Sequence, residues 1–132
     1  MSELFQYHLK GKGHSGRAIR IGALLSHEVE DNLVAAAKLA GTEATPVEIK
    51  KIEWRNGVKL FIRSFTEPCE NPLAEDVKWK KSSVAIFDDE GLAKYFTAKD
   101  CQVLESLYRE YHEVTQKELD DIVGKPLPVS GD

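Results

Sequence analysis

The stretch "TPVEIKKIEWRNGVKLFIRSFTE", residues 45–67, decides how the middle of this chain folds. Its first four residues are a helix start signal, with a threonine that can cap, a proline that suits the first helical position and a glutamate that can complete a capping box. The continuation is ambiguous, because Asn56-Gly57 between two apolar runs is also a strong β-hairpin signal.

Helical periodicity favours the first alternative. At 100° per residue the large apolar side chains fall within about 50° of one line; they are Val47, Trp54, Val58, Phe61, Ile62 and Phe65. Strand alternation would instead place Phe61 on a charged face with Lys59 and Arg63. The sequence therefore predicts one helix over 46–66 that tolerates Gly57 at a cost of about 1 kcal/mol, with a hairpin within 49–66 as the open alternative.

The first 22 residues have strand character. "FQYHLK" (5–10) alternates apolar and polar residues, and "RAIRI" (17–21) repeats the alternation less cleanly. Between them stands "GKGHSG" (11–16), which fits the G-x-G-x-x-G pattern of dinucleotide-binding loops. Such a loop leads into a helix, whereas a second alternating segment follows here. Residues 4–22 are therefore predicted to form a β-hairpin whose glycines supply positive φ angles.

The tip of this hairpin is basic. We expect it to touch an acidic partner through Lys10, Lys12, His14 and Arg17.

Caps and apolar stripes predict further helices over 27–40, 89–96 and 98–112, and one more that starts at Thr115. Residues 67–83 lack a clean period and are predicted to be loop. The expected fold class is α+β, mainly α, with an N-terminal β-hairpin followed by a small bundle of four to five helices. We expect one globular domain over 1–124, with its helical part at 27–124, and a flexible C-terminal tail at 125–132.

The 132 residues carry a net charge of −4, which is unevenly distributed. Residues 1–20 carry a net of +3, and the segment 88–121 carries a net of −6. This polarity favours contact with another protein or between copies, and it does not favour nucleic acid, which needs a basic face. No apolar run approaches the length of a membrane span and no signal peptide is recognisable, so we expect a cytoplasmic protein with reduced Cys69 and Cys101.

Residue patterns for chemistry are weak. The four histidines lack the spacing of a helical metal site, and Cys101, although it begins a helix, has no recognisable base and orienting group. The carboxylates between 88 and 121 fall mostly on predicted helix surfaces. We therefore expect no enzyme activity, no catalytic residues, no metal and no cofactor.

The aromatic residues on the predicted helices are the remaining candidates for a site. Trp54, Phe61, Phe65, Tyr108 and Tyr111 fall on helical stripes, which are typical of core packing and otherwise of a groove for a partner. Aromatic side chains are frequent anchors at interfaces.

Three segments resemble the small tail assembly chaperones of tailed bacteriophages: "SHEVEDNLVAAAKLAG" (26–41), residues 45–67, and "FTAKDCQVLESLYREYHEVTQKELDDIVGKP" (96–126). The resemblance implies a viral protein, without catalytic residues, that works in the host cytoplasm. It would bind the tape-measure and tail-tube proteins while the tail is assembled.

Two alternatives stay open at this point. The chain could be a virion structural or connector subunit, since its charge polarity suits head-to-tail contacts in a symmetric homo-oligomer. It could also be a phage-encoded inhibitor that binds a host protein.

Overall fold

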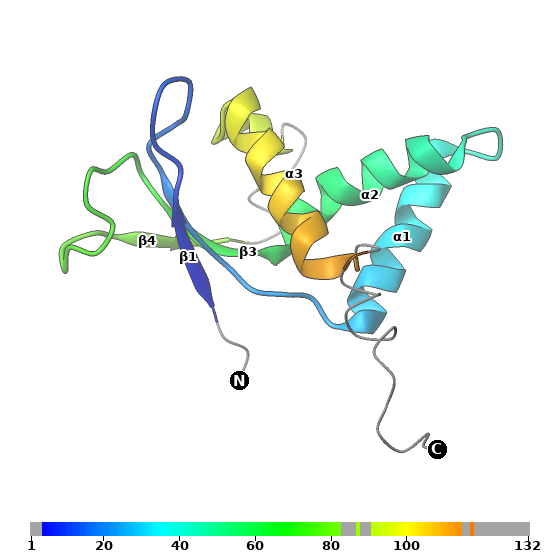
Figure 1. Ribbon diagram of the computed structural model, residues 1–132, viewed down its shortest axis with the longest axis horizontal. Coiled ribbons are helices and arrows are strands. Elements are labelled where there is room, and N and C mark those ends of the chain that lie inside the picture. The colour runs from blue at the N-terminus through cyan, green and yellow to red at the C-terminus, as the bar shows by residue number, and fades with distance from the viewer. Residues whose placement is uncertain (1–3, 83–86, 88–90, 115–116, 118–132) are drawn as a thin grey trace, which may run out of the picture.

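The computed structural model describes residues 4–82, 87, 91–114 and 117. In this part, four strands form an antiparallel sheet in the order β1-β2-β3-β4: β1 (Phe5–His8), β2 (Ala18–Ile21), β3 (Ile62–Thr66) and β4 (Trp79–Lys81). The helices are α1 (Ser26–Ala40), α2 (Pro46–Phe61), α3 (Ala98–His112) and a 3₁₀ turn, η1 (Gly91–Lys94) (Figure 1).

The predicted hairpin followed by a bundle of four to five helices is wrong. The chain is α+β, with three α-helices interleaved with a four-stranded sheet in the described part. The hairpin itself is confirmed, with Phe5 opposite Ile21 and His8 opposite Ala18. The helices predicted over 27–40 and 98–112 are also confirmed, the first beginning one residue earlier.

The error lies at the junction of α2 and β3. Helix α2 ends at Phe61, and residues 62–66 leave the helix to pair with β2. Arg20 faces Ser64 while the next residue, Ile21, faces Ile62, so the ladder contains a bulge. The bulge allows Ile62 and Phe65, three residues apart, both to be buried. That spacing matches a helix better than a strand, which explains the misreading.

Gly57 lies inside α2, so the hairpin alternative at Asn56-Gly57 is excluded. A Cβ atom at Gly57 would stand 2.2 Å from Cε1 of Tyr108 on α3. The glycine therefore marks a close contact between two helices, which only a residue without a side chain permits.

Strand β4 was missed because it is three residues long and carries two lysines. Short, lysine-bearing strands are typical of sheet edges, and their sequences look like loop. Of the helix predicted over 89–96, η1 covers 91–94. The predicted helix from Thr115 and the tail at 125–132 lie outside the described residues, apart from position 117.

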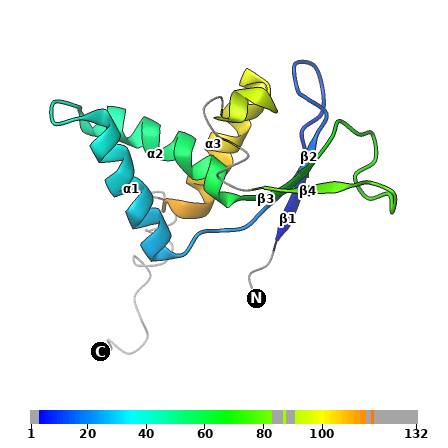
Figure 2. The same ribbon diagram turned by 180° about the vertical axis from the view of Figure 1, so that it is seen from behind.

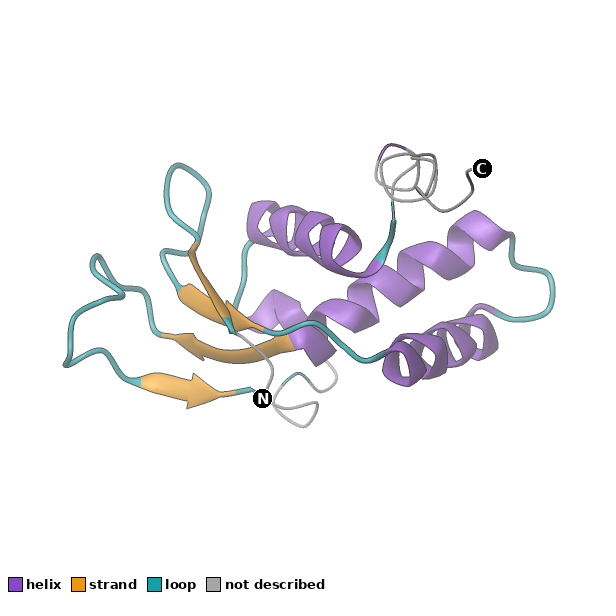
Figure 3. Ribbon diagram, turned by 60° about the horizontal axis from the view of Figure 1, so that its bottom comes forward, coloured by secondary structure: helices purple, strands orange, loops and turns teal. Residues whose placement is uncertain are grey.

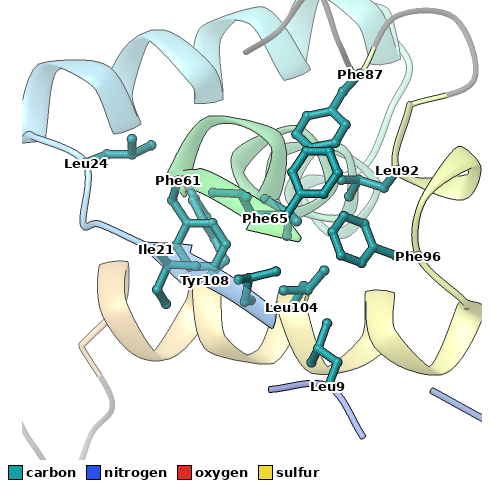
Figure 4. Close-up of a cluster of buried hydrophobic side chains, with 13 residues drawn as sticks. Leu9, Ile21, Leu24, Phe61, Phe65, Phe87, Leu92, Phe96, Leu104 and Tyr108 are labelled. Carbon is teal, nitrogen blue, oxygen red and sulfur yellow. The ribbon is translucent and has the colours of Figure 1, made fainter. Parts of the chain in front are cut away.

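The hydrophobic core lies between α3, the end of α2 and one face of the sheet (Figure 4). Tyr7 on β1 reaches Tyr111 on α3, and Phe65 on β3 packs against Phe96 just before α3. Helices α1 and α2 form a hairpin that extends away from the sheet, with its connecting turn at the far end of the molecule (Figures 1 and 2). Figure 3 shows the sheet and this hairpin at opposite ends.

Candidate functional site

The helical hairpin carries a groove between α1 and α2. Two hollows open along it, of about 460 and 390 Å³. Leu33 of α1 and Lys50 of α2 line both, so the hollows are adjacent along the groove. The two helices are antiparallel neighbours, and from Val29 to Ala37 the groove follows α1 for about 12 Å, at 1.5 Å per residue.

One end of the groove is apolar. Besides the shared Leu33 and Lys50 it is lined by Val34, Ala37, Pro46 and Ile49. Val34 is 50% exposed, although α1 has a second face that is fully packed, with Asn32 and Ala36 buried. Helix α1 is thus apolar on more than the face it needs for the core. Surface apolar area of this kind marks contact sites in soluble proteins.

The other end is acidic and reaches α3. Its lining includes Glu30 from α1, Glu53 from α2 and Glu113, which follows α3. Glu53 is 2% exposed. Lys50 Nζ lies 3.2 Å from Glu53 Oε1 and 3.5 Å from Glu113 Oε2. Although its partial burial acts against the charged form, these two carboxylates raise the pKa of Lys50.

His112 lines the acidic end of the groove as a neutral imidazole ring. The Leu24 N–H donates to its Nε2 at 2.8 Å, and its Nδ1–H donates to the carbonyl of Tyr108 at 2.8 Å. Burial lowers the pKa of His112, against the opposing effect of the bond to Tyr108. Because both ring nitrogens are engaged in this tautomer, His112 supplies shape and no charge.

Glu113, at the rim of the acidic end, contacts side chains of both α2 and α3. Trp54 Nε1 donates to Glu113 at 2.7 Å, and Arg109 lies 3.8 Å from the same carboxylate. The Arg109 guanidinium also covers the Trp54 ring at 4.2 Å from its centroid. These contacts fix the C-terminal end of α3 against α2.

The predicted partner-binding aromatics divide into two groups. Phe61, Phe65 and Tyr108 are between 0 and 1% exposed, so they belong to the core and cannot contact a partner while it is intact. Trp54 and Tyr111 are half-buried, and Tyr111 lines the acidic end of the groove. Burial and its hydrogen bond with Tyr7 raise the pKa of Tyr111 to about 12, so its hydroxyl stays neutral.

Residues the sequence reasoning missed form most of the groove, above all Val34, Ile49 and Glu53. A usable signal was present, because Leu33 and Val34 are adjacent, and adjacent apolar residues widen a helical stripe beyond one core face.

Half of the predicted basic contact is used internally. Lys10 and Lys12 are exposed, as expected for a surface contact. His14 Nδ1 lies 2.6 Å from the buried Asp100 Oδ1. Arg17 donates to the carbonyls of Tyr95 and Thr66 at 2.8 and 3.0 Å.

The glycine-rich loop is therefore a docked hairpin turn. It joins two antiparallel strands, and Gly11, Gly13 and Gly16 all have positive φ, as predicted. Asp100, at the start of α3, also accepts from the N–H groups of Ser15 and Thr97 at 3.1 and 3.2 Å. The loop is thus anchored to the N-terminus of α3.

Cys101 is half-buried beside Asp100. Burial raises the pKa of the Cys101 thiol, and the charges of Glu105 and Asp100 act in the same direction. These effects outweigh the opposing charge of Arg55, which lowers the pKa.

Comparisons with known protein families, with curated proteins and with solved structures gave no match. Of the helices in the described residues, none combines the length and apolar character that crossing a membrane requires.

Proposed function

We propose that this protein binds another polypeptide by taking one of its amphipathic helices into the α1–α2 groove, and that it does so as a tail assembly chaperone of a tailed bacteriophage. The observation that carries the binding role is the open apolar end of the groove, a hollow of about 390 Å³ beside the half-exposed Val34. A groove between two helices suits a third helix, whose apolar side chains fill it at i, i+3 and i+4 spacing.

A helical partner is favoured by the dimensions and character of the groove. Its length of about 12 Å along α1 matches roughly two turns of a bound helix. The chaperone role is supported by the resemblance of segments 26–41, 45–67 and 96–126 to tail assembly chaperones. In that role, the long helical partner is the tape-measure protein.

On this proposal, the test is co-expression with the tape-measure protein of the same phage, followed by affinity purification and mass spectrometry. The wild-type chain should retain the tape-measure protein and should be absent from purified phage particles. Val34→Glu should reduce the recovered tape-measure protein at least tenfold, because it places a charge in the apolar end. Val103→Glu, at a comparably exposed position on α3 outside the groove, is the matched control and should bind normally.

Other outcomes would separate the alternatives. A fixed number of copies in purified particles would identify a structural or connector subunit. Equimolar recovery with one host protein would identify an inhibitor. Equal recovery by the Val34→Glu and Val103→Glu variants would contradict the groove as the binding site.

A further inference from the structure

The acidic end of the groove has an excess of negative charge. Among the residues that the structure describes, Glu30, Glu53 and Glu113 line it together with one cation, Lys50, since His112 is neutral. Glu113 already accepts from Trp54 and lies near two cations, whereas Glu30 is exposed at the edge. Glu30 and Glu53 are therefore the carboxylates with which a further cation could pair.

Glu53 is under-satisfied for a buried carboxylate. Its Oε1 is fully enclosed and receives no hydrogen bond from the described residues. Lys50 Nζ is 3.2 Å away and forms an ion pair with it, but the same ammonium also serves Glu113 at 3.5 Å. One ammonium therefore serves two carboxylates, and the remaining negative charge of this end is complementary to a further cation on a partner.

The walls around these carboxylates are apolar. Leu24, Val29, Leu33 and the ring of Tyr111 line the same hollow of about 460 Å³. Apolar walls that lead to a carboxylate suit a side chain with an aliphatic stem and a cationic head, which describes lysine and arginine.

We propose that the acidic end receives a lysine or arginine side chain of the bound helix, whose apolar residues occupy the other end. The groove would then select helices in which a basic residue stands about two turns, or about seven residues, from the apolar anchors. This inference rests on the proposed function, because it names a feature of the same partner. It also assigns a role to the exposed Glu30 and to the buried Glu53 beside it in the groove.

The first experiment uses a pair of helical peptides built from leucine and alanine, one with a single lysine two turns from the leucines and its twin with glutamine there. Binding to the full chain is measured by titration calorimetry. The lysine peptide should bind about tenfold more tightly, as one charge-assisted hydrogen bond permits. Glu30→Gln and Glu53→Gln should each reduce this preference, and Glu43→Gln, in the exposed turn after α1, should leave it unchanged.

The second experiment uses agmatine, a short cation that needs no helical partner, and follows backbone amide shifts by NMR. Shifts that saturate at Leu24, Val29 and His112, and that weaken in Glu30→Gln, would support the cation preference independently of the peptides. Because Glu30 is exposed, that variant should fold even if Glu53→Gln does not.

The outcomes distinguish this inference from the proposed function. Equal binding of the two peptides would overturn the inference and leave groove binding intact. Agmatine binding without binding of either peptide would overturn the proposed function, and with it the claim that the cation belongs to a bound helix. Absence of binding by both probes would overturn both.

Discussion

At Gly57 the Tyr108 ring of α3 packs directly against the backbone of α2. The Tyr108 ring occupies the space that a side chain would fill, and it is itself 0% exposed. Tyr108 also receives a long hydrogen bond of 3.4 Å from Asn32 on α1. One glycine therefore makes room for a ring of α3 that contacts both α1 and α2.

Gly57→Ala is expected to lower the free energy of unfolding by about 1–3 kcal/mol, the usual cost of overpacking. Alanine gains up to about 1 kcal/mol of helix propensity over glycine, but a Cβ at 2.2 Å from Tyr108 forces the helices apart. Urea unfolding measures the change. Asn56→Ala, the neighbouring position in α2, is the control and should be close to neutral; a stabilised Gly57→Ala variant would contradict the close contact.

The helices are defined by caps that differ in their surroundings. The Thr97 hydroxyl at the start of α3 accepts from the Asp100 N–H at 3.1 Å. The Asp100 carboxylate in turn accepts from the Thr97 N–H, which completes a capping box. Thr45 at the start of α2 accepts from the Glu48 N–H at 3.2 Å, in an exposed position. The first cap also holds the residue that anchors the glycine-rich loop.

Thr97→Ala is therefore expected to cost about 1–2 kcal/mol of stability, and Thr45→Ala about 0.5–1 kcal/mol, within the range of lost N-caps. The same substitution at Thr42, an exposed turn residue without a capping role, should cost little. Thermal or urea unfolding of the three variants gives the comparison. Equal losses at Thr97 and Thr45 would show that the loop anchor adds nothing to the cap.

At the scale of the whole molecule, Asp100 links the sheet to the helices. It is 0% exposed and holds residues from the β1–β2 loop against the first turn of α3. Burial alone would raise the pKa of Asp100, but the hydrogen bonds from Ser15, His14 and Thr97 outweigh it and lower the pKa from its usual 3.8. The folded state therefore binds the Asp100 proton less readily than the unfolded state does.

This sign fixes the pH dependence. The stability contributed by Asp100 is fully present above pH 3.8 and is lost as the pH falls through that value toward the lower folded pKa. Asp100→Asn should lose about 1–3 kcal/mol at pH 7 and should show a shallower loss of stability between pH 5 and 2. Urea unfolding across this range is the measurement, with Asp31→Asn, on the exposed side of α1, as control. An unchanged acid profile in Asp100→Asn would contradict the anchoring role.

The sequence by itself determined the elements whose signals are local. The β1–β2 hairpin, α1 and α3 follow from alternation, caps and stripes carried by adjacent residues, and the positive φ of Gly11, Gly13 and Gly16 follows from their place in a turn. Of the candidate site, the sequence identified Tyr111 on the groove and Trp54 at its rim, and the exposed lysines of the loop.

Only the tertiary structure decided the rest. The spacing of Ile62 and Phe65 predicts a helix, but in the structure their segment pairs with β2 through a bulge. The sequence of β4 predicts a loop, but pairing with β3 makes it a strand. The groove likewise exists only when α1 and α2 lie side by side. Val34 and Ile49 are ordinary apolar residues in the sequence, and only the packing of the two helices decides that they line a groove. Hydrogen-bond partners and shared surfaces come from residues distant in the chain, so no window of sequence contains the energy that selects them.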